Sequence, residues 1–409
     1  MGGVLKWGGR ILGLLVLVAA IALALNWSRV ERLSAVMSLF EPDRIVTNHS
    51  NMNQLFETAA LPRGDGPMAA LPMAPGSLPT SFEHGGESHD IADWMASHAT
   101  TSIVVLHDGA LIYEDYLQGT TAEDRRISWS VAKSFLSVLL GTVVEEGAIA
   151  SLDDPVVQYV PELEGSAYQD ATVRNVAQMA SGVAFNEDYL DFNSDINRMG
   201  RVLALGFSMD DFAAGLTETV RPPGEAWAYV SIDTHVLGMV IRGATGRSAT
   251  ELMAERVIAP LGMESEPYYV TDGYGVAFVL GGLNMMTRDY ARFGQMVLDG
   301  GVAPGGRIVS EAWIAESIAP SAPPRPARTA RSGAPRYGFQ WWIPDGARPG
   351  EVFAVGIYDQ FVYIDRQSRV VVAMNSANRG FAEPGNLDGQ IALFRAIRDH
   401  VADTDTAEN

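Results

Sequence analysis

The stretch "ISWSVAKSF", residues 127–135, places a serine and a lysine three residues apart, at Ser130 and Lys133. Residues at positions i and i+3 of a helix lie on the same face, so the two side chains meet if this stretch is helical. An amine that has lost its proton can act as a base toward a neighbouring hydroxyl, which then becomes a nucleophile. The pair therefore indicates nucleophilic chemistry on a serine.

The segment that follows Ser130 explains how this lysine could lose its charge. Its residues from Val131 to Leu140 are apolar on nearly every side, which is typical of a buried helix, and Gly147 closes the helix predicted for residues 130–146. Burial disfavours the ammonium ion and lowers the lysine pKa. Alone, the same spacing is also compatible with an N-cap serine and a lysine whose amine extends to solvent.

Other catalytic chemistries find less support in the sequence. The chain contains no cysteine, which excludes disulfides, thiolate zinc sites and a cysteine nucleophile. The nucleophile elbow G-x-S-x-G is absent. The seven histidines show no metal-ligand spacing and no obvious place in a catalytic triad. Lysine is therefore the better candidate base, and we predict neither a metal nor an organic cofactor.

Two downstream segments complete a pattern with the serine–lysine pair. "WAYVSIDTHVLG" contains Tyr229-Val230-Ser231 just ahead of a predicted helix, and "FAVGIYDQFVYID" contains Ala354-Val355-Gly356 in a predicted strand. Alone, Tyr229 is more typical of a core tyrosine, and Ser231 of a helix cap. In this order, however, the three elements match the serine–lysine motif, the second hydroxyl motif and the glycine-terminated strand of penicillin-recognising serine enzymes.

The pattern resembles the serine β-lactamase-like superfamily, on its class C β-lactamase and carboxylesterase side, over about residues 90–400. Flanking segments agree, namely "SLDDPVVQYVPEL" (151–163), "VRNVAQMASGV" (173–183), "GGLNMMTRDYARFGQMVLDGG" (281–301) and "YGFQWW" (337–342). Within the superfamily, "FNEDY" (185–189), Tyr229-x-Ser231 and "GIYDQ" (356–360) most resemble the 6-aminohexanoate-dimer hydrolase branch. That branch contains esterases and hydrolases of linear amides.

The resemblance implies a role for each matching residue. Ser130 would be the nucleophile that forms an acyl-enzyme, Lys133 would take its proton, and Tyr229 would pass the proton to the leaving group and help to activate the deacylating water. The oxyanion hole would use the backbone N–H groups of Ser130 and Ile357. The substrate contacts that the resemblance implies are Tyr189, Ser231, Asn284, Gly356 and Tyr358.

The sequence also departs from the pattern of the superfamily. Ala354 stands where β-lactamases and D-alanyl peptidases usually carry a lysine, or sometimes a histidine, that meets the carboxylate of the substrate. Esters and amides without that carboxylate therefore fit better. Asp359 stands where the branch often has a small residue, and we expect it to narrow the cleft or repel anions. Glu187 and Asp188 are interpreted as loop residues. The arginine- and proline-rich residues 319–338 form either a solvated loop or a basic lip beside an anion-binding site.

The order of predicted elements favours an α+β fold. Two strands flank Asp108-Gly109 within residues 101–116, a strong hairpin signal, and three short strands are predicted at 351–357, 360–364 and 369–374. Helices lie between, including one after an N-cap at Thr287, and a last helix is predicted at 387–401. We expect one antiparallel sheet flanked by terminal helices, plus a mostly helical lobe, in the β-lactamase/penicillin-binding-protein-like arrangement that the resemblance implies.

The N-terminus carries a possible membrane segment. Lys6 and Arg10 precede a run of fifteen apolar residues without a charge, 11–25, and tryptophans bracket this run. From tryptophan to tryptophan it is long enough to cross a bilayer if Arg10 snorkels. We therefore predict a membrane anchor within residues 1–27, inserted in the inner membrane with the rest of the chain in the periplasm or outside the cell. The alternative is a cleaved signal peptide, which would leave a secreted protein.

The rest of the chain divides into three predicted parts. Residues 28–90 form a stalk, because prolines punctuate a stretch of alanine, glycine and serine. Residues 91–402 form the hydrolase domain, and residues 403–409 form an acidic tail without regular structure.

Charge limits the partners that this protein could bind. The formal net charge is -20, which argues against nucleic acid because a phosphate backbone needs a basic face. The favoured hypothesis is an exported, membrane-anchored serine hydrolase that cleaves small esters or linear amides. The alternatives are a D-amino-acid peptidase or β-lactamase, and a binding or sensor domain of the same fold without turnover. The oligomeric state stays open.

Overall fold

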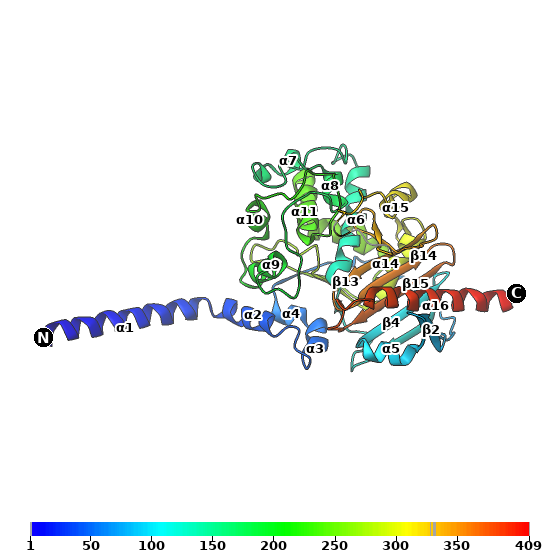
Figure 1. Ribbon diagram of the computed structural model, residues 1–409, viewed down its shortest axis with the longest axis horizontal. Coiled ribbons are helices and arrows are strands. Elements are labelled where there is room, and N and C mark those ends of the chain that lie inside the picture. The colour runs from blue at the N-terminus through cyan, green and yellow to red at the C-terminus, as the bar shows by residue number, and fades with distance from the viewer. Residues whose placement is uncertain (1, 328, 330–332, 409) are drawn as a thin grey trace.

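The structure is a computed structural model that describes residues 2–327, 329 and 333–408. A seven-stranded antiparallel sheet lies between helices, and a mostly helical lobe lies beside it (Figure 1). In spatial order the strands of this sheet are β11 (Arg336–Tyr337), β12 (Trp342–Ile343), β13 (Glu351–Gly356), β14 (Gln360–Asp365), β15 (Val370–Ser376), β4 (Thr100–His107) and β5 (Ala110–Tyr116). The sheet thus joins the first and the last third of the domain, and the predicted α+β arrangement is confirmed.

The central strand β4 shows why the sheet needs cover on both faces. Ile103 and Val105 belong to one apolar cluster, which also includes residues of α5 (Ile91–Ser97) and α16 (Asn386–Glu408). Val104 and Leu106 belong to the other cluster, with residues of α14 (Thr287–Leu298). Successive side chains of a strand point to opposite faces, so an unbroken apolar run requires partners on both sides.

The hairpin and the three late strands predicted from the sequence are confirmed. His107 pairs with Ala110, and the turn residues Asp108 and Gly109 have φ of 48° and 78°, as a two-residue hairpin of type I′ requires. β13, β14 and β15 pair antiparallel in chain order, and β15 then pairs with β4. Thr287 is the first residue of α14, whereas Met286 occupies the N-cap position that was predicted for Thr287.

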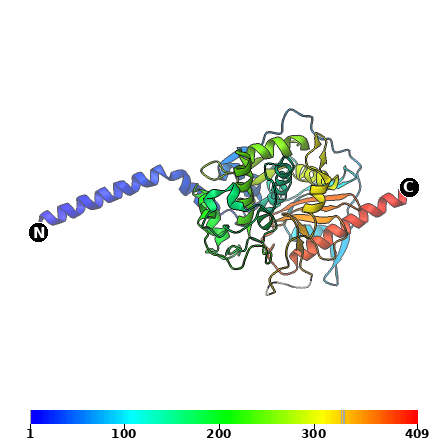
Figure 2. The same ribbon diagram turned by 90° about the horizontal axis from the view of Figure 1, so that it is seen from above.

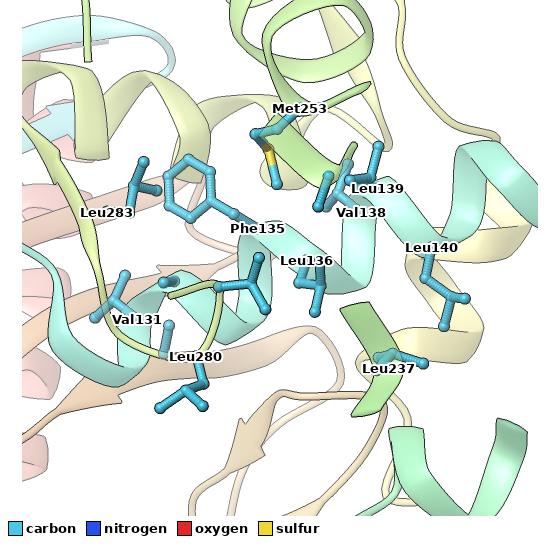
Figure 3. Packing of buried hydrophobic residues seen from close by; sticks show 14 of the residues in the cluster. Val131, Phe135, Leu136, Val138, Leu139, Leu140, Leu237, Met253, Leu280 and Leu283 are labelled. Carbon is cyan, nitrogen blue, oxygen red and sulfur yellow. The ribbon is translucent and has the colours of Figure 1, made fainter. Parts of the chain in front are cut away.

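The helical lobe is built around α6 (Ala132–Glu145), which lies buried along nearly its whole length. Figure 3 shows Phe135 and Leu136 of α6 among apolar side chains that come from later in the chain, such as Leu237, Met253 and Leu283. The other helices between the two halves of the sheet are α7 (Val156–Tyr159), η2 (Pro161–Leu163), α8 (Val173–Ala177), α9 (Asp195–Ala204), α10 (Met209–Ala214), α11 (Ser231–Thr245), α12 (Ala249–Met253), the π-helical turn η3 (Ala254–Ile258), α13 (Ala259–Leu261) and α15 (Glu311–Ser317).

Smaller strands tie segments that are distant in sequence. A four-stranded sheet has the order β1 (Thr58–Ala60), β7 (Tyr268–Val270), β8 (Leu283–Met285), β6 (Arg126–Ile127). Two hairpins are formed by β2 (Ser81–His84) with β3 (Glu87–Asp90), and by β9 (Val302–Ala303) with β10 (Gly306–Arg307). β6 ends just before the short 3-10 turn η1 (Trp129–Val131), so the four-stranded sheet leads the chain into the serine–lysine segment.

The N-terminal helix α1 (Gly2–Leu25) projects away from the rest of the molecule in both views (Figures 1 and 2). Its segment Trp7–Leu25 is long and apolar enough to cross a membrane, by length and composition, and none of it is buried against the protein. It is followed by α2 (Trp27–Met37), α3 (Ile45–Ser50) and α4 (Met52–Leu55).

The stalk expected for residues 28–90 is instead packed on the domain. Leu39, Met52 and Leu61 are buried in the main apolar core, and β1 pairs antiparallel with β7. Farther on, the backbone N–H groups of Ala74 and Gly76 donate to carbonyls of β5 at 3.0 and 2.9 Å. Thr58 of β1, for example, pairs with Val270, far along the chain, and a local composition pattern carries no information about such a partner.

The C-terminal helix also runs farther than expected. α16 extends from Asn386 to Glu408, so it includes most of the acidic segment predicted to lack regular structure. Residue 409 of that predicted tail lies outside the described residues.

Candidate active site

The structure brings Ser130 and Lys133 together at the start of α6. Ser130 lies in the turn η1, and Lys133 Nζ is 2.9 Å from Ser130 Oγ and 2.8 Å from the carbonyl oxygen of Leu280. Lys133 is only 2% exposed, and burial lowers its pKa from 10.5 to about 7. An amine with this pKa is partly unprotonated at neutral pH, so it can accept the proton of the neighbouring hydroxyl.

The turn that presents Ser130 has an unusual backbone. Trp129 has a φ of 41°, in the left-handed region that a bulky residue rarely adopts. Its indole Nε1 donates to His49 Nε2 of α3 at 3.4 Å. Burial, together with the charge of Arg126, lowers the pKa of His49 well below its usual value, so the imidazole is neutral and able to accept this bond. The N-terminal segment thus supports the turn that holds the candidate nucleophile.

Tyr229 lies close to both Lys133 and Ser130. The lysine Nζ is 5.3 Å from the centroid of the tyrosine ring. Burial raises the pKa of Tyr229, and the charge of Glu187 raises it further, whereas interactions with the side chains of Ser130 and Ser231 act in the other direction. The phenol is therefore protonated at neutral pH, and its hydroxyl can donate a proton toward a group bound at Ser130.

Glu187 also lies in the candidate active site. The sequence did not predict this role, since Glu187 was interpreted as a loop residue. Its carboxylate accepts from the backbone N–H of Ser231 at 2.8 Å and from the hydroxyl of Tyr189 at 2.6 Å, and the Ser231 hydroxyl also donates to it. Burial raises the pKa of Glu187, while the charge of Lys133 lowers it. "FNEDY" contained the signal, but nothing in one sequence tells which acid of a loop points inward. Asp188 is exposed and accepts from the N–H of Leu190 at 2.9 Å.

Gly356 lets the end of β13 approach the turn η1. A Cβ at Gly356 would lie 2.5 Å from the carbonyl oxygen of Ser128 and 2.9 Å from the backbone nitrogen of Ser130, both too close for a real side chain. The next residue, Ile357, borders the same cavities as Ser130. The glycine predicted from the sequence therefore has a steric reason, which is to bring two stretches of backbone together beside the hydroxyl of Ser130.

Two cavities meet at Ser130. The larger one, which we call the apolar cavity, has a volume of about 330 Å³. It lies between the N-terminal segment and the segment of Tyr189 and α9, and Ser231, Ile357 and Tyr358 also border it. The smaller one, which we call the Tyr229 pocket, has a volume of about 160 Å³. Its lining includes Tyr189, Tyr229, Trp342, Gly356 and Ile357. Ser130 is thus open to a bound molecule on two sides.

Asn284 and Asp359 lie in surroundings that differ from those predicted from the sequence. Asn284, expected to contact substrate, is fully buried in β8, where its Nδ2 donates to the carbonyl of Gly282 at 2.8 Å, and it does not border either cavity at Ser130. Asp359 borders the Tyr229 pocket, but its carboxylate accepts hydrogen bonds from Asn378, Asn386 and Gln390 at 2.6–3.0 Å. These amides hold the carboxylate of Asp359 in place, so it serves to anchor the segment after β15.

The arginine- and proline-rich insertion lies near the Tyr229 side of the site. The guanidinium carbon of Arg325 lies 4.0 Å from the ring centroid of Trp227, which stacks on Tyr337. Residues 328 and 330–332 of this insertion lie outside the described residues, and the basic lip stays a prediction. Within the described part of the chain, no group of three or more His, Asp or Glu side chains is placed to hold a metal ion.

Comparisons with known proteins agree with this architecture. The profile of the Beta-lactamase family matches residues 88–396. The chain is 32% identical over 339 residues to a 6-aminohexanoate-dimer hydrolase from Paenarthrobacter ureafaciens, which covers 80% of this chain and 84% of that protein. A solved structure, "Putative 6-aminohexanoate-dimer hydrolase from Bacillus anthracis", has a TM-score of 0.75 at 24% identity and covers 89% of this chain and 95% of its own. A family VIII carboxylesterase has a TM-score of 0.52 at 17% identity, with coverage of 73% and 92%.

The fold and its relatives define the class of this protein as serine hydrolases of the β-lactamase fold. The chain belongs to the beta-lactamase family. The resemblance stated from the sequence is thereby confirmed, and with it the fold class and the expectation of a hydrolase.

Proposed function

We propose that the protein cleaves an ester or a linear amide through an acyl-enzyme on Ser130, with Lys133 as the general base and Tyr229 as the proton shuttle. The observation that carries the proposal is the contact of 2.9 Å between Lys133 Nζ and Ser130 Oγ in surroundings that lower the lysine pKa to about 7. A base whose pKa lies near the working pH combines a large unprotonated fraction with a useful driving force for proton transfer.

In the acylation step, Ser130 Oγ attacks the carbonyl carbon of the substrate while its proton passes to Lys133 Nζ. The carbonyl oxygen gains negative charge, and the backbone N–H groups of Ser130 and Ile357 stabilise it. The close approach of Gly356 to Ser128 and Ser130 supports this assignment. The bond to the leaving alcohol or amine then breaks, and that group takes its proton through the hydroxyl of Tyr229. Water then attacks the carbonyl carbon of the acyl-enzyme, and its proton passes through the side chains of Tyr229 and Lys133 to Ser130 Oγ as the bond between Oγ and the acyl carbon breaks and the acid leaves.

Esters and linear amides are favoured over β-lactams by the residue at the third motif. Ala354 is buried in β13 and brings no positive charge to the site, so a substrate carboxylate lacks its usual partner there. The relative from Paenarthrobacter ureafaciens is by name a 6-aminohexanoate-dimer hydrolase. Tyr189, Ser231, Gly356 and Tyr358 border the two cavities and are the proposed substrate contacts.

We also propose that the protein is exported and held at the inner membrane by α1, with the catalytic domain on the outer side. The apolar segment Trp7–Leu25, exposed over its whole length, supports an anchor. A cleaved signal peptide passes the same criteria, and sequencing the N-terminus of the mature protein distinguishes the two.

The test compares the wild type with Ser130→Ala and Lys133→Met on p-nitrophenyl esters, 6-aminohexanoate dimer and nitrocefin. We expect ester or amide turnover, little nitrocefin hydrolysis, and a loss of at least about a thousandfold in kcat for either variant. Because the neutral amine is the base, kcat/KM should rise with pH through about 7 and then level off. Equal activity in the Ser130→Ala protein would sink the proposal, and rapid nitrocefin turnover would favour a β-lactamase.

A further inference from the structure

The apolar cavity has an interior and a rim of different character. Its interior is made of buried apolar side chains from four separate parts of the chain: Leu39, Met52, Ile127, Met199, Val270, Phe278 and Leu280. Its rim is apolar as well but exposed, since Met37, Leu190 and Phe192 are 60%, 79% and 56% exposed. Its volume of about 330 Å³ falls within the range of about 300–1,000 Å³ that small-molecule sites occupy.

The polar side chains on the wall away from Ser130 are already engaged. Asn197 donates to the carbonyl oxygens of Tyr189 and Asp191 at 3.0 and 2.8 Å. Arg201 is the only formally charged side chain among the described residues that line the cavity. It donates to the carbonyl of Phe192 at 2.8 Å, and its guanidinium lies over the ring of the same residue. An ammonium in the cavity would therefore lose its water without gaining a carboxylate among the described lining residues, which is costly.

The position of Tyr229 tells which part of a substrate enters this cavity. Tyr229 borders the Tyr229 pocket and not the apolar cavity, while Ser130 borders both. If Tyr229 passes the proton to the leaving group, the leaving group occupies the Tyr229 pocket. The acyl part of the substrate then extends in the other direction, into the apolar cavity.

The rim of the cavity lies on the side of the molecule where the membrane-length helix joins it. α2 follows α1 after a single residue, and its end supplies Val36 and Met37 to the cavity. Arg32 of α2 fixes this junction, because it donates to the carbonyl of Ala204 at 3.1 Å and pairs with Glu57 at 2.9 Å. The exposed apolar rim is thus tied to the segment that leads to α1, the proposed membrane anchor.

We propose that the apolar cavity binds the hydrocarbon chain of a lipophilic ester or amide, with the chain entering from a lipid surface past Met37, Leu190 and Phe192. This inference rests on the proposed function and names its substrate class. It also separates this protein from a hydrolase of short amides whose acyl part carries an ammonium, because that group finds no carboxylate among the described residues that line the cavity. Burial of each added methylene makes a longer chain a better substrate until the cavity is full.

Gly200 of α9 is a position at which a side chain can be added beside the cavity. It borders the apolar cavity, and a Cβ built on it meets nothing within 4 Å. Gly200→Phe should block the cavity, whereas Gly200→Ala adds only a methyl group. Both substitutions favour the helix over glycine, so they form a matched pair.

The first measurement uses p-nitrophenyl esters from acetate to decanoate, each below its aggregation concentration. For the wild type and Gly200→Ala, kcat/KM should rise about fourfold per methylene over several steps. Gly200→Phe should lose at least about tenfold on decanoate but stay within about twofold on acetate. A wild-type rate that falls with chain length, or equal effects of Gly200→Phe on both esters, overturns the inference. In that case Ser130-dependent cleavage of p-nitrophenyl acetate would still support the proposed function.

The second measurement tests the lipid surface as the source. The full-length protein in phosphatidylcholine vesicles is given an acyl ester that partitions into the same vesicles, or an equal amount in separate vesicles. We expect at least about tenfold faster cleavage in the shared vesicles, and a loss of about fivefold when Leu190 and Phe192 are both replaced by serine. Equal rates in shared and separate vesicles contradict entry from a lipid surface.

Discussion

At the scale of single residues, the site depends on a lysine whose burial lowers the free energy of unfolding. Lys133 has a pKa of about 7 in the folded protein against 10.5 when exposed. Between these values the unfolded chain binds one proton more than the folded chain, so this residue makes stability rise with pH across that window. Below pH 7 the full penalty of holding a buried ammonium applies. The protein thus gives up stability at neutral pH to have a base in contact with Ser130.

Glu187 sets how readily that base gives up its proton. Its negative charge raises the pKa of Lys133, and burial acts in the opposite direction and more strongly. Glu187→Gln keeps an oxygen for the N–H of Ser231 but removes the charge. We expect the rising limb of kcat/KM against pH to move to lower pH, by a few tenths to about one unit.

The measurement is a pH–rate profile on a p-nitrophenyl ester, with Asp188→Asn as the control because Asp188 is exposed. Asp188→Asn should leave the pH of the rising limb of kcat/KM unchanged. A limb that moves to higher pH in Glu187→Gln would contradict the electrostatic role of this carboxylate, whereas a uniform loss of rate would mean that it only positions Ser231 and Tyr189.

The sequence alone proposed Ser130, Lys133 and Tyr229 as candidates, because the three motifs occur in order, and the structure places these side chains together. The sequence was not enough for Glu187 and Asn284. Whether a loop acid points toward a lysine depends on the path of the loop, and Asn284 faces away from the cavities because of its place in β8. The orientation of these two side chains cannot be predicted from residue type or spacing.

At the scale of elements, the contact between β13 and η1 is the feature that the proposed oxyanion hole depends on. Gly356→Ala would put a methyl group 2.5 Å from the carbonyl of Ser128 and 2.9 Å from the nitrogen of Ser130. Both contacts are with backbone, which cannot rotate away, so the strand end or the turn must shift. We expect kcat to fall by about a hundredfold or more, as for the loss of one donor of an oxyanion hole.

Steady-state kinetics of Gly356→Ala beside Gly200→Ala check this expectation, since a Cβ at Gly200 meets nothing within 4 Å. Circular dichroism and the melting temperature of each variant separate local displacement from unfolding. A Gly356→Ala protein with unchanged kcat would show that the end of β13 contributes nothing to transition-state stabilisation.

The elements of the sheet were predictable because their signals are local. Asp108-Gly109 marks a two-residue hairpin, and β13, β14 and β15 are short apolar runs with turn residues between them. The N-terminal elements were not predictable in the same way. The pairing of β1 with β7 and the burial of Leu39 depend on residues far along the chain, and the prolines from Pro62 onward indicated a stalk.

At the scale of the whole molecule, the N-terminal segment is part of the domain and a wall of the site. Phe40 stacks on Tyr358 with ring centroids 4.6 Å apart, and His49 accepts from Trp129. The same segment continues from a helix that is long and apolar enough, by length and composition, to cross a membrane. The site is therefore built partly from the residues that connect the catalytic domain to α1.

Two methionines of this segment test that conclusion. Met52 is 2% exposed and Met37 is 60% exposed. Met52→Ala should lower the free energy of unfolding by about 2–4 kcal/mol, because it leaves a gap in the core, and Met37→Ala should stay within about 0.5 kcal/mol. Urea denaturation of the two variants beside the wild type gives both values. Two equally small effects would support a loosely attached stalk.

The central claim is that Ser130 is the nucleophile of a serine hydrolase, and covalent labelling tests it most directly. The protein is treated with a p-nitrophenyl alkylphosphonate, which leaves a stable adduct on an attacking serine, and its peptides are mapped by mass spectrometry. We predict one phosphonyl group per chain on the peptide with Ser130, a parallel loss of esterase activity, and no labelling of Ser130→Ala. An adduct on another residue that accompanies the loss of activity would contradict the account.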